Sequence, residues 1–195
     1  MAFWNDAAAD PKRKYRFLIR LFGDNEQESI AWYVKSVSAP SFEITSVEHH
    51  FSDHVFNFPG KIKWTDVEVT LVDPAGGDDV VFKTLNLIKN SGYSIPNLSQ
   101  DEKDIFKTFS KNTLVKNNGN VSIETQDGNG DTIEIWTLNN AFITNVKFGD
   151  FDYASEDLRD ITISLKYDWA SCEFPGSGET GSPSGTFFTK GPTNG

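Results

Sequence analysis

Residues 160–169 read Asp-Ile-Thr-Ile-Ser-Leu-Lys-Tyr-Asp-Trp, a stretch in which polar and apolar side chains alternate without a break. A period of two residues places every apolar side chain on one face of a β-strand and every polar side chain on the other. One buried face and one solvated face are typical of strands in antiparallel sheets. The stretch therefore predicts one strand from Asp160 to Trp169 in an antiparallel protein.

Two other stretches, Tyr15–Phe22 and Asp66–Asp73, show the same alternation. Weaker strand candidates are Ile30–Val37, Phe42–Val47, Val121–Gln126, Thr132–Leu138 and Phe142–Phe148. The sequence Asp-Gly-Asn-Gly-Asp at 127–131 joins two of these candidates and is a strong hairpin signal. The pattern predicts a mainly β fold with a minor α component, built as an antiparallel β-sandwich or barrel.

Helical signals occur only in the middle of the chain. Asp78 is a candidate cap for a helix with the apolar stripe Val81, Leu85 and Ile88, which Gly92 would end. A second helix is expected after Ser99, where the Ser-Gln-Asp-Glu sequence has capping-box spacing before Ile105, Phe106 and Phe109. We expect one or two helices that flank the sheets.

The composition changes after Phe174, where Gly, Pro, Ser and Thr dominate. Such a segment buries too little surface to offset its ordering entropy. We therefore predict one β domain at 1–174 and a flexible tail at 175–195. Phe187 and Phe188 are the exception, because they are candidates to dock on a neighbouring subunit; the alternative is a passive tail.

The formal net charge of the 195-residue chain is −10, which disfavours a protein that binds nucleic-acid phosphates. The single cysteine, Cys172, excludes an internal disulfide framework, and no apolar run is long enough to span a membrane. No secretory signal is evident at the N-terminus, so synthesis and folding in a reducing cytoplasm are expected.

The sequence offers little that predicts catalysis or a cofactor. His49, His50 and His54 surround Asp53, and these are side chains that zinc prefers, but His49 and His50 would point to opposite faces of a strand. The calcium-loop pattern that starts at Asp127 fails at its sixth and twelfth positions. We find no phosphate-loop, dinucleotide or nucleophile-elbow motif. We expect no enzyme and no cofactor, and a metal-binding β domain remains a weaker alternative.

Several segments in order resemble a known family. They are Asp10–Arg13 before the strand Tyr15–Phe22, then Trp32–Val37, Pro40–Glu43, His54–Gly60, Trp64–Asp73, Phe142–Val146 and Asp160–Trp169. Their order and spacing are similar to the tail tube proteins of T-even-like contractile-tailed bacteriophages, especially the cyanophage-type members. The resemblance implies a ring-forming fold of the phage tail tube type. Six subunits would join strands edge to edge, and the hexameric rings would stack into the conduit for DNA ejection.

The resemblance also implies partners and a location. The partners would be the tail sheath, tape-measure, baseplate and tail-terminator proteins, with phage DNA passing through without specific binding. The subunit would lie in the virion tail after assembly in the host cytoplasm. A baseplate tube initiator and a type VI secretion-like tube protein remain alternatives, because they share this fold.

Candidate site residues follow from joining the resemblance to the strand pattern. Glu43, Asp66 and Glu68 are candidates to line the lumen of the tube. The equal alternative is that these carboxylates face the solvent outside it. A hairpin between His49 and Asp66 is expected to lap onto the next ring. Its candidate contact residues are His49, His50, His54, Phe56 and Phe58.

Overall fold

The computed structural model describes residues 11–21, 33–74, 79–90, 92–93, 110–118, 121–176 and 184–189. The elements in these ranges are, in chain order, β1 (Phe17–Arg20), β2 (Val34–Val37), β3 (Phe42–Phe51), β4 (His54–Trp64), β5 (Val67–Val72), α1 (Val80–Asn90), α3 (Lys111–Asn118), β6 (Val121–Gln126), β7 (Thr132–Asn139), β8 (Phe142–Lys147), β9 (Asp160–Lys166), β10 (Trp169–Pro175) and β11 (Ser184–Phe187).

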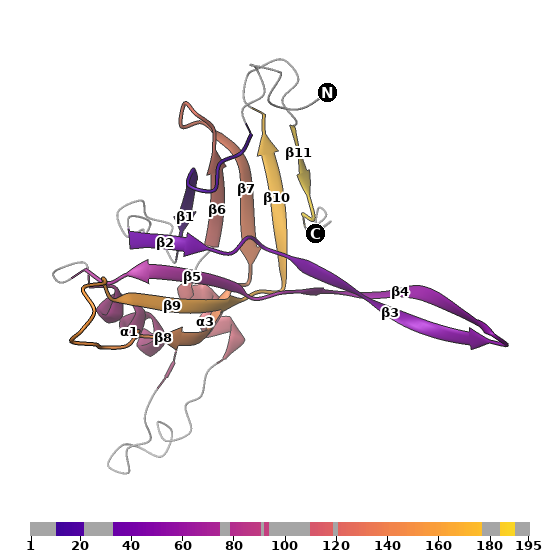
Figure 1. Ribbon diagram of the computed structural model, residues 1–195, viewed down its shortest axis with the longest axis horizontal. Helices are drawn as coiled ribbons and strands as arrows, with labels where there is room; N and C mark the ends of the chain where they lie inside the picture. The colour runs from indigo at the N-terminus through magenta and orange to yellow at the C-terminus, as the bar shows by residue number, and fades with distance from the viewer. Residues whose placement is uncertain are drawn as a thin grey trace, which may run out of the picture.

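The strands form two packed sheets and one projecting hairpin (Figure 1). In the described part of the chain, sheet A has the order β1-β6-β7-β10-β11 and sheet B has the order β2-β5-β9-β8. The strand pairs within both sheets are antiparallel. The strands of sheet A run across those of sheet B (Figure 1), as in orthogonally packed sandwiches. The predicted mainly β, antiparallel fold class is confirmed.

The core lies between the two sheets, because each sheet turns its apolar positions inward. Sheet B contributes the odd-numbered residues of β5 and β9, which alternate with exposed or half-buried polar residues. The buried core residues are Ile19, Leu21, Val67, Val69, Leu71, Val80, Val121, Ile123, Leu138, Ala141, Ile161, Ile163, Leu165, Tyr167 and Ala170. Cys172 is also buried, and burial raises the pKa of its thiol.

The stretch 160–169 is not one strand, which corrects the first prediction. β9 ends in sheet B at Lys166, and β10 begins in sheet A at Trp169. At the corner between them, the Asp168 N–H donates to the Asn139 carbonyl (3.1 Å). The Asp168 carboxylate accepts bonds from Lys111 Nζ (2.6 and 2.8 Å) and from Asn140 Nδ2 (2.7 Å). Polar and apolar residues continue to alternate in the sequence through this corner. The two-residue period therefore does not predict that the chain changes sheets there.

The Asp168 corner leads to a pH prediction. The hydrogen bonds from Lys111 and then Asn140 hold the pKa of Asp168 below its usual value. A carboxyl group with a lowered folded pKa stabilises the fold above its unfolded pKa, and this stabilisation is lost as the pH falls through the folded pKa. Asp168→Asn should therefore lower the free energy of unfolding at pH 7 only slightly, by less than about 1 kcal/mol for so exposed a group.

The same variant should lose less stability than the wild type when the pH falls below about 4, near the ordinary aspartate pKa. Urea unfolding at pH 7 and pH 3 measures both effects. Asp150→Asn is the matched control, because the Asp150 side chain is almost fully exposed. An identical acid dependence in wild type and Asp168→Asn would contradict the prediction.

The first predicted helix is confirmed as α1, with its details corrected. Asp79 is the cap: its Oδ1 accepts from the Phe82 N–H at 2.8 Å, whereas the predicted cap Asp78 lies outside the described residues. The buried side chains of α1 include Val80 and Thr84, and the predicted stripe residue Leu85 is 49% exposed. The register error arises because helical periodicity alone does not say which face meets the sheets.

The second predicted helix, after Ser99, lies outside the described residues. The structure has instead α3, which was not predicted from the sequence. Ser110 caps it, since the Ser110 Oγ accepts from the Thr113 N–H at 3.2 Å. The Asn-rich composition of α3 gives it a weak apolar stripe, which explains why the sequence pattern missed it.

Both ends of the predicted domain differ from expectation. β1 is shorter than the predicted strand Tyr15–Phe22: Tyr15 is exposed, and Phe22 lies outside the described residues. The predicted flexible tail at 175–195 contains β11, which pairs with β10 from Cys172↔Phe187 to Pro175↔Ser184. Backbone pairing with the edge of β10 orders this short segment despite its Gly/Ser/Thr composition.

Candidate assembly surfaces

β3 and β4 form a long hairpin that projects from the body of the protein (Figure 1). Its register runs from Phe42↔Trp64 at the base to Phe51↔His54 at the tip, so it begins earlier than the predicted His49–Asp66 hairpin and includes the predicted strand Phe42–Val47. All residues of the two strands except Trp64 are exposed. A free two-stranded hairpin is marginally stable in water, so these exposed strands are a candidate contact surface.

The apolar side chains of the hairpin change faces halfway along it. Near the base, the pairs Phe42↔Trp64 and Ile44↔Ile62 share one face, and Glu43↔Lys63 lies on the other. Beyond an irregularity between Ile44 and Ser46, the apolar set moves to the opposite face. We call this second set the distal aromatic face; it consists of Val47, His49, Phe51, His54, Phe56 and Phe58. The hairpin thus offers two different surfaces.

Gly60 makes this change of face possible. Two residues of β4, Gly60 and Lys61, lie opposite Thr45 alone, which is the pattern of a β-bulge. Thr45 Oγ1 accepts from the Lys61 N–H at 2.9 Å. A Cβ atom at position 60 would lie 2.4 Å from Thr45 Oγ1 and 2.9 Å from the Thr45 carbonyl oxygen. The bulge therefore needs glycine.

An aromatic cluster anchors the base of the hairpin. The Phe42 and Trp64 rings lie 5.2 Å apart, and Phe188 packs edge-on against both, at 5.9 and 5.8 Å. Trp64 also contacts Tyr167 at 5.9 Å, and burial raises the pKa of Tyr167 to about 12, so its phenol is neutral at physiological pH. Edge-on aromatic pairs stabilise beyond the area they bury. The cluster holds the hairpin against the body.

The predicted tail contacts Phe187 and Phe188 pack within their own chain. Phe188 belongs to the base cluster, and Phe187 packs on Phe174 of β10 at 6.0 Å. Phe187 and Phe188 remain 55% and 48% exposed, so docking on a neighbouring subunit stays a prediction. The local sequence contained no signal for the partner strand, which lies earlier in the chain.

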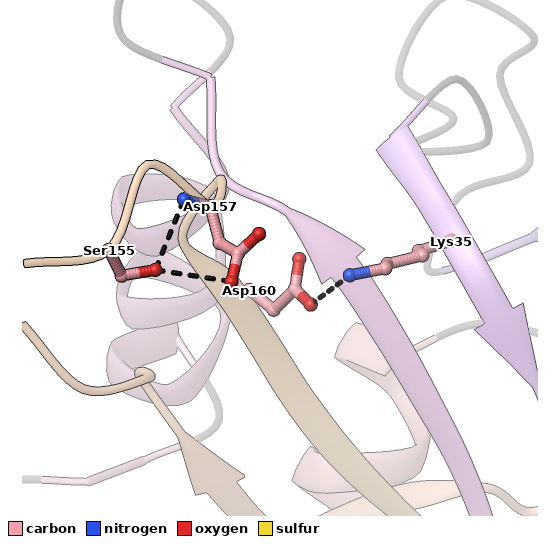
Figure 2. A network of polar contacts seen from close by, with 4 residues as sticks. All are labelled: Lys35, Ser155, Asp157 and Asp160. Atoms are coloured by element: carbon pink, nitrogen blue, oxygen red, sulfur yellow. Dashed lines mark hydrogen bonds and ion pairs between the residues drawn. The ribbon is translucent and has the colours of Figure 1, made fainter.

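The face of sheet B that points away from the core is polar. Cross-strand pairs on it include Glu68↔Ser164 and Thr70↔Thr162. Lys35 on β2 reaches across this face to Asp160 on β9, with Nζ and Oδ2 2.6 Å apart (Figure 2). The hydrogen bond that Lys35 donates to the Asp160 carboxylate raises the pKa of Lys35. Three lysines, Lys35, Lys147 and Lys166, and the acids Glu68 and Asp160 give this face charges of both signs.

The outer edges of sheet B are β2 and β8. Within the residues that the structure describes, no strand pairs with either outer edge. An unpaired edge presents backbone N–H and C=O groups that can pair with another chain. Sheet B therefore has the geometry to be extended at both sides by copies of itself.

The predicted lumen residues lie on sheet B and at the base of the hairpin. Glu68 is on the polar face of sheet B. Glu43 and Asp66 line an open cleft of about 610 Å³ at the hairpin base, where Asp66 faces Lys166 of the polar face at 3.8 Å. That they face a lumen stays a prediction. On the polar face itself, acids and lysines are interspersed.

The three histidines lie near the hairpin tip. His49 pairs with Phe56 and His50 with Val55, so the two imidazoles are on opposite faces. His54 contacts Phe56 at 6.2 Å between ring centroids. In the described ranges, no group of three or more His, Cys, Asp or Glu side chains is placed to hold a metal ion. No helix in those ranges is long and apolar enough to cross a membrane.

By sequence, the chain matches no protein-family model and no curated protein. Solved structures with a similar fold come from contractile injection systems. One is the sheath/tube terminator of an extracellular contractile injection system called PVC, with 21% identity, a TM-score of 0.59, and coverage of 86% of this chain and 99% of the other. Another is the tube-terminating cap of the anti-feeding prophage, with 20% identity, a TM-score of 0.59, and coverage of 89% and 99%.

A third similar structure is the anti-feeding prophage baseplate, with 13% identity, a TM-score of 0.59, and coverage of 84% of this chain and 96% of the other. At such identities the likeness establishes the fold. The chain therefore has the tail-tube-type β fold found in contractile injection systems. Nearly the whole of each matched chain is covered, so the likeness is to the complete subunit fold.

Proposed function

We propose that this protein is the structural subunit of the inner tail tube of a contractile-tailed bacteriophage and has no enzymatic activity. Six copies form a ring, rings stack into a tube, and the tube is the conduit for DNA ejection. The observation that carries the proposal is the β3–β4 hairpin, because its residues other than Trp64 are exposed and its other large apolar side chains remain between 43% and 69% exposed. Exposed apolar surfaces of this kind mark association sites.

Sheet B supports the ring. Pairing of β8 of one subunit with β2 of the next would satisfy the open edges and close a continuous barrel after six copies. The polar face of sheet B, with Glu68 on it, then faces the lumen. Because lysines and acids are interspersed there, the wall would hold DNA phosphates only weakly, and DNA would pass without strong counterion-releasing contacts.

The resemblance of the sequence to phage tail tubes supports the proposed partners. These are the tail sheath, tape-measure, baseplate and tail-terminator proteins, and the location is the virion tail after assembly in the host cytoplasm. The similarity in fold to chains of a sheath/tube terminator and a baseplate structure agrees with this set.

A second candidate is a baseplate tube initiator, which would be a single ring at one end of a tube; a type VI secretion-like tube protein is a further alternative with this fold. The observation that favours the initiator is the similarity to structures of a tube cap and a baseplate. The two candidates differ in whether the protein polymerises beyond one ring, which a solution experiment can decide.

We expect the purified protein to form six-fold rings and stacked tubes. Sedimentation velocity over a range of concentrations, with negative-stain imaging of the same samples, measures this. Single rings that never stack would favour the end-ring candidate. A monomer at every concentration, even with baseplate and sheath components added, would overturn the proposed function.

A further inference from the structure

Without β11, the strand β10 would be an open edge of sheet A. β10 has seven residues, Trp-Ala-Ser-Cys-Glu-Phe-Pro, and its one charge is at Glu173. An apolar strand of this length with unpaired N–H and C=O groups can pair with the edge of another chain. β11 pairs with the C-terminal half of β10, from Cys172↔Phe187 to Pro175↔Ser184. It therefore occupies the place where a second chain would add a strand (Figure 1).

β11 is itself a poor template for further pairing. It has four residues, Ser-Gly-Thr-Phe, and β1 at the opposite edge of sheet A also has four. Natural sheets often end in very short strands, because a short strand offers few backbone groups to another chain. β11 thus shields β10 without presenting a comparable edge of its own.

Phe188 turns the chain away from β10 immediately after β11. Its φ is 58°, in the left-handed region that a bulky side chain rarely adopts. Such a conformation persists where the surrounding contacts fix it. Here the contacts are the rings of Phe42 and Trp64 at the hairpin base, whose centroids lie 5.9 and 5.8 Å from that of Phe188. The turn ends the pairing with β10 and anchors the segment on the hairpin base.

Few contacts hold β11 in place. Phe187 packs on Phe174 at 6.0 Å, four register pairs join its backbone to β10, and its residues other than Gly185 are exposed. Segments with few buried contacts open at a lower free energy than the core of a protein. β11 can therefore detach from β10 while the core between the two sheets stays folded.

We propose that residues 184–189, which we call the β11 strap, shield the β10 edge of sheet A from a second copy of this chain. With the strap closed, β10 has a neighbour on each side, β7 and β11. With the strap open, the β10 strands of two copies pair in a two-fold arrangement. This inference goes beyond the proposed tube function, because the proposed ring uses the edges of sheet B.

The single cysteine allows the strap to be locked. Cys172 lies opposite Phe187 in the register, and directly opposed residues of antiparallel strands are close enough for a disulfide. The double variant Phe187→Cys, Phe188→Ala removes both aromatic anchors and adds a second thiol. Oxidised glutathione converts the two thiols into one S–S bond and is reduced to two molecules of glutathione. The same chain is thus obtained with the strap loosened or fixed.

The reduced double variant should form a species of at least twice the mass of the wild-type particle, and the oxidised variant should lose it. Sedimentation velocity of the full-length chain over a range of concentrations measures this, and mass spectrometry without reductant verifies the bond. Wild type treated with the same oxidant is the control, because its Cys172 has no second thiol in the chain.

Hydrogen exchange of a second variant reports on the edge directly. Proline fixes φ at about −65°, whereas Gly185 has a φ of 155°, so Gly185→Pro should prevent β11 from forming. The amides of β10 that bond to β11 should then lose their protection. The amides of β5 and β9 should keep theirs, because the core does not include the strap.

Equal sedimentation of the reduced double variant and the wild type would overturn the shielding role. Failure of the added thiol to bond with Cys172, or unchanged protection of β10 in Gly185→Pro, would show that β11 does not cover β10 and would overturn the strap itself. None of these outcomes requires rings or tubes. A wild type that never forms rings would therefore overturn the tube function and leave the strap to be decided by its own measurements.

Discussion

Replacing Gly60 with valine will abolish tube formation and leave the two-sheet body folded. A Cβ at this position would lie 2.4 Å from Thr45 Oγ1, and the carbonyl oxygen at 2.9 Å belongs to the backbone, which cannot rotate away as a side chain can. The bulge would be lost or displaced, and a shift of one residue turns every side chain beyond it to the other face. The distal aromatic face would then point away from its partner.

The effect on assembly should be nearly complete, whereas the effect on the body should be small. In the described residues, every side chain of β3 and β4 except Trp64 is exposed, so the core between sheets A and B does not depend on the hairpin beyond its base. Sedimentation and imaging report assembly, and thermal unfolding reports the body. Gly128→Ala is the control: a Cβ there meets only the end of the Arg16 side chain, at 3.4 Å. Tubes of normal length from Gly60→Val would contradict the assigned role of the bulge.

Leu165→Ala should cause the largest loss of subunit stability. Leu165 is fully buried at the centre of sheet B, paired with Val67 on one side and Ile143 on the other. Truncation of a buried leucine removes its transfer free energy and leaves a cavity, which costs about 2–5 kcal/mol. For a chain of this length, that loss corresponds to a fall in Tm of roughly 4–20 °C.

Urea unfolding and thermal unfolding of the unassembled subunit measure this effect. Leu158→Ala is the matched control, since it makes the same chemical change at an exposed loop position and should alter stability by no more than about 0.5 kcal/mol. Equal destabilisation by the two variants would show that the interior of sheet B is not the stabilising core of the fold.

Much of the fold was predictable from residue patterns. The alternation in β5 and β9, the turn at 127–131 and the helix near Val81 all appear in the structure close to their predicted places. Asp127 organises its turn as expected, since its Oδ1 accepts from the N–H groups of Asn129 and Asp131 at 2.8 and 2.9 Å. These features depend on neighbours within a few residues, so a local pattern contains the information.

The candidate surfaces were predicted less well. The aromatic and histidine residues of the hairpin were identified, but the exposed apolar side chains of residues 148–159 were not. Phe151 and Tyr153 alternate with Asp150 and Asp152, but only the structure shows that these two rings and Leu158 are exposed. The alternation of carboxylates and aromatic residues at 150–153 was the one sequence signal for this exposed segment.

The sequence by itself determined that this protein is mainly antiparallel β, because the two-residue period decides which side chains each strand can bury. Only the tertiary structure decided that residues 160–169 divide between two sheets at Asp168, that β11 returns to pair with β10, and that the apolar face of the hairpin changes sides at Gly60. Each of these depends on backbone partners far away in the chain. Periodicity in the sequence predicts which side chains of a strand are exposed. Hydrogen-bond partners far away in the chain decide which sheet the strand belongs to and which way its apolar face points.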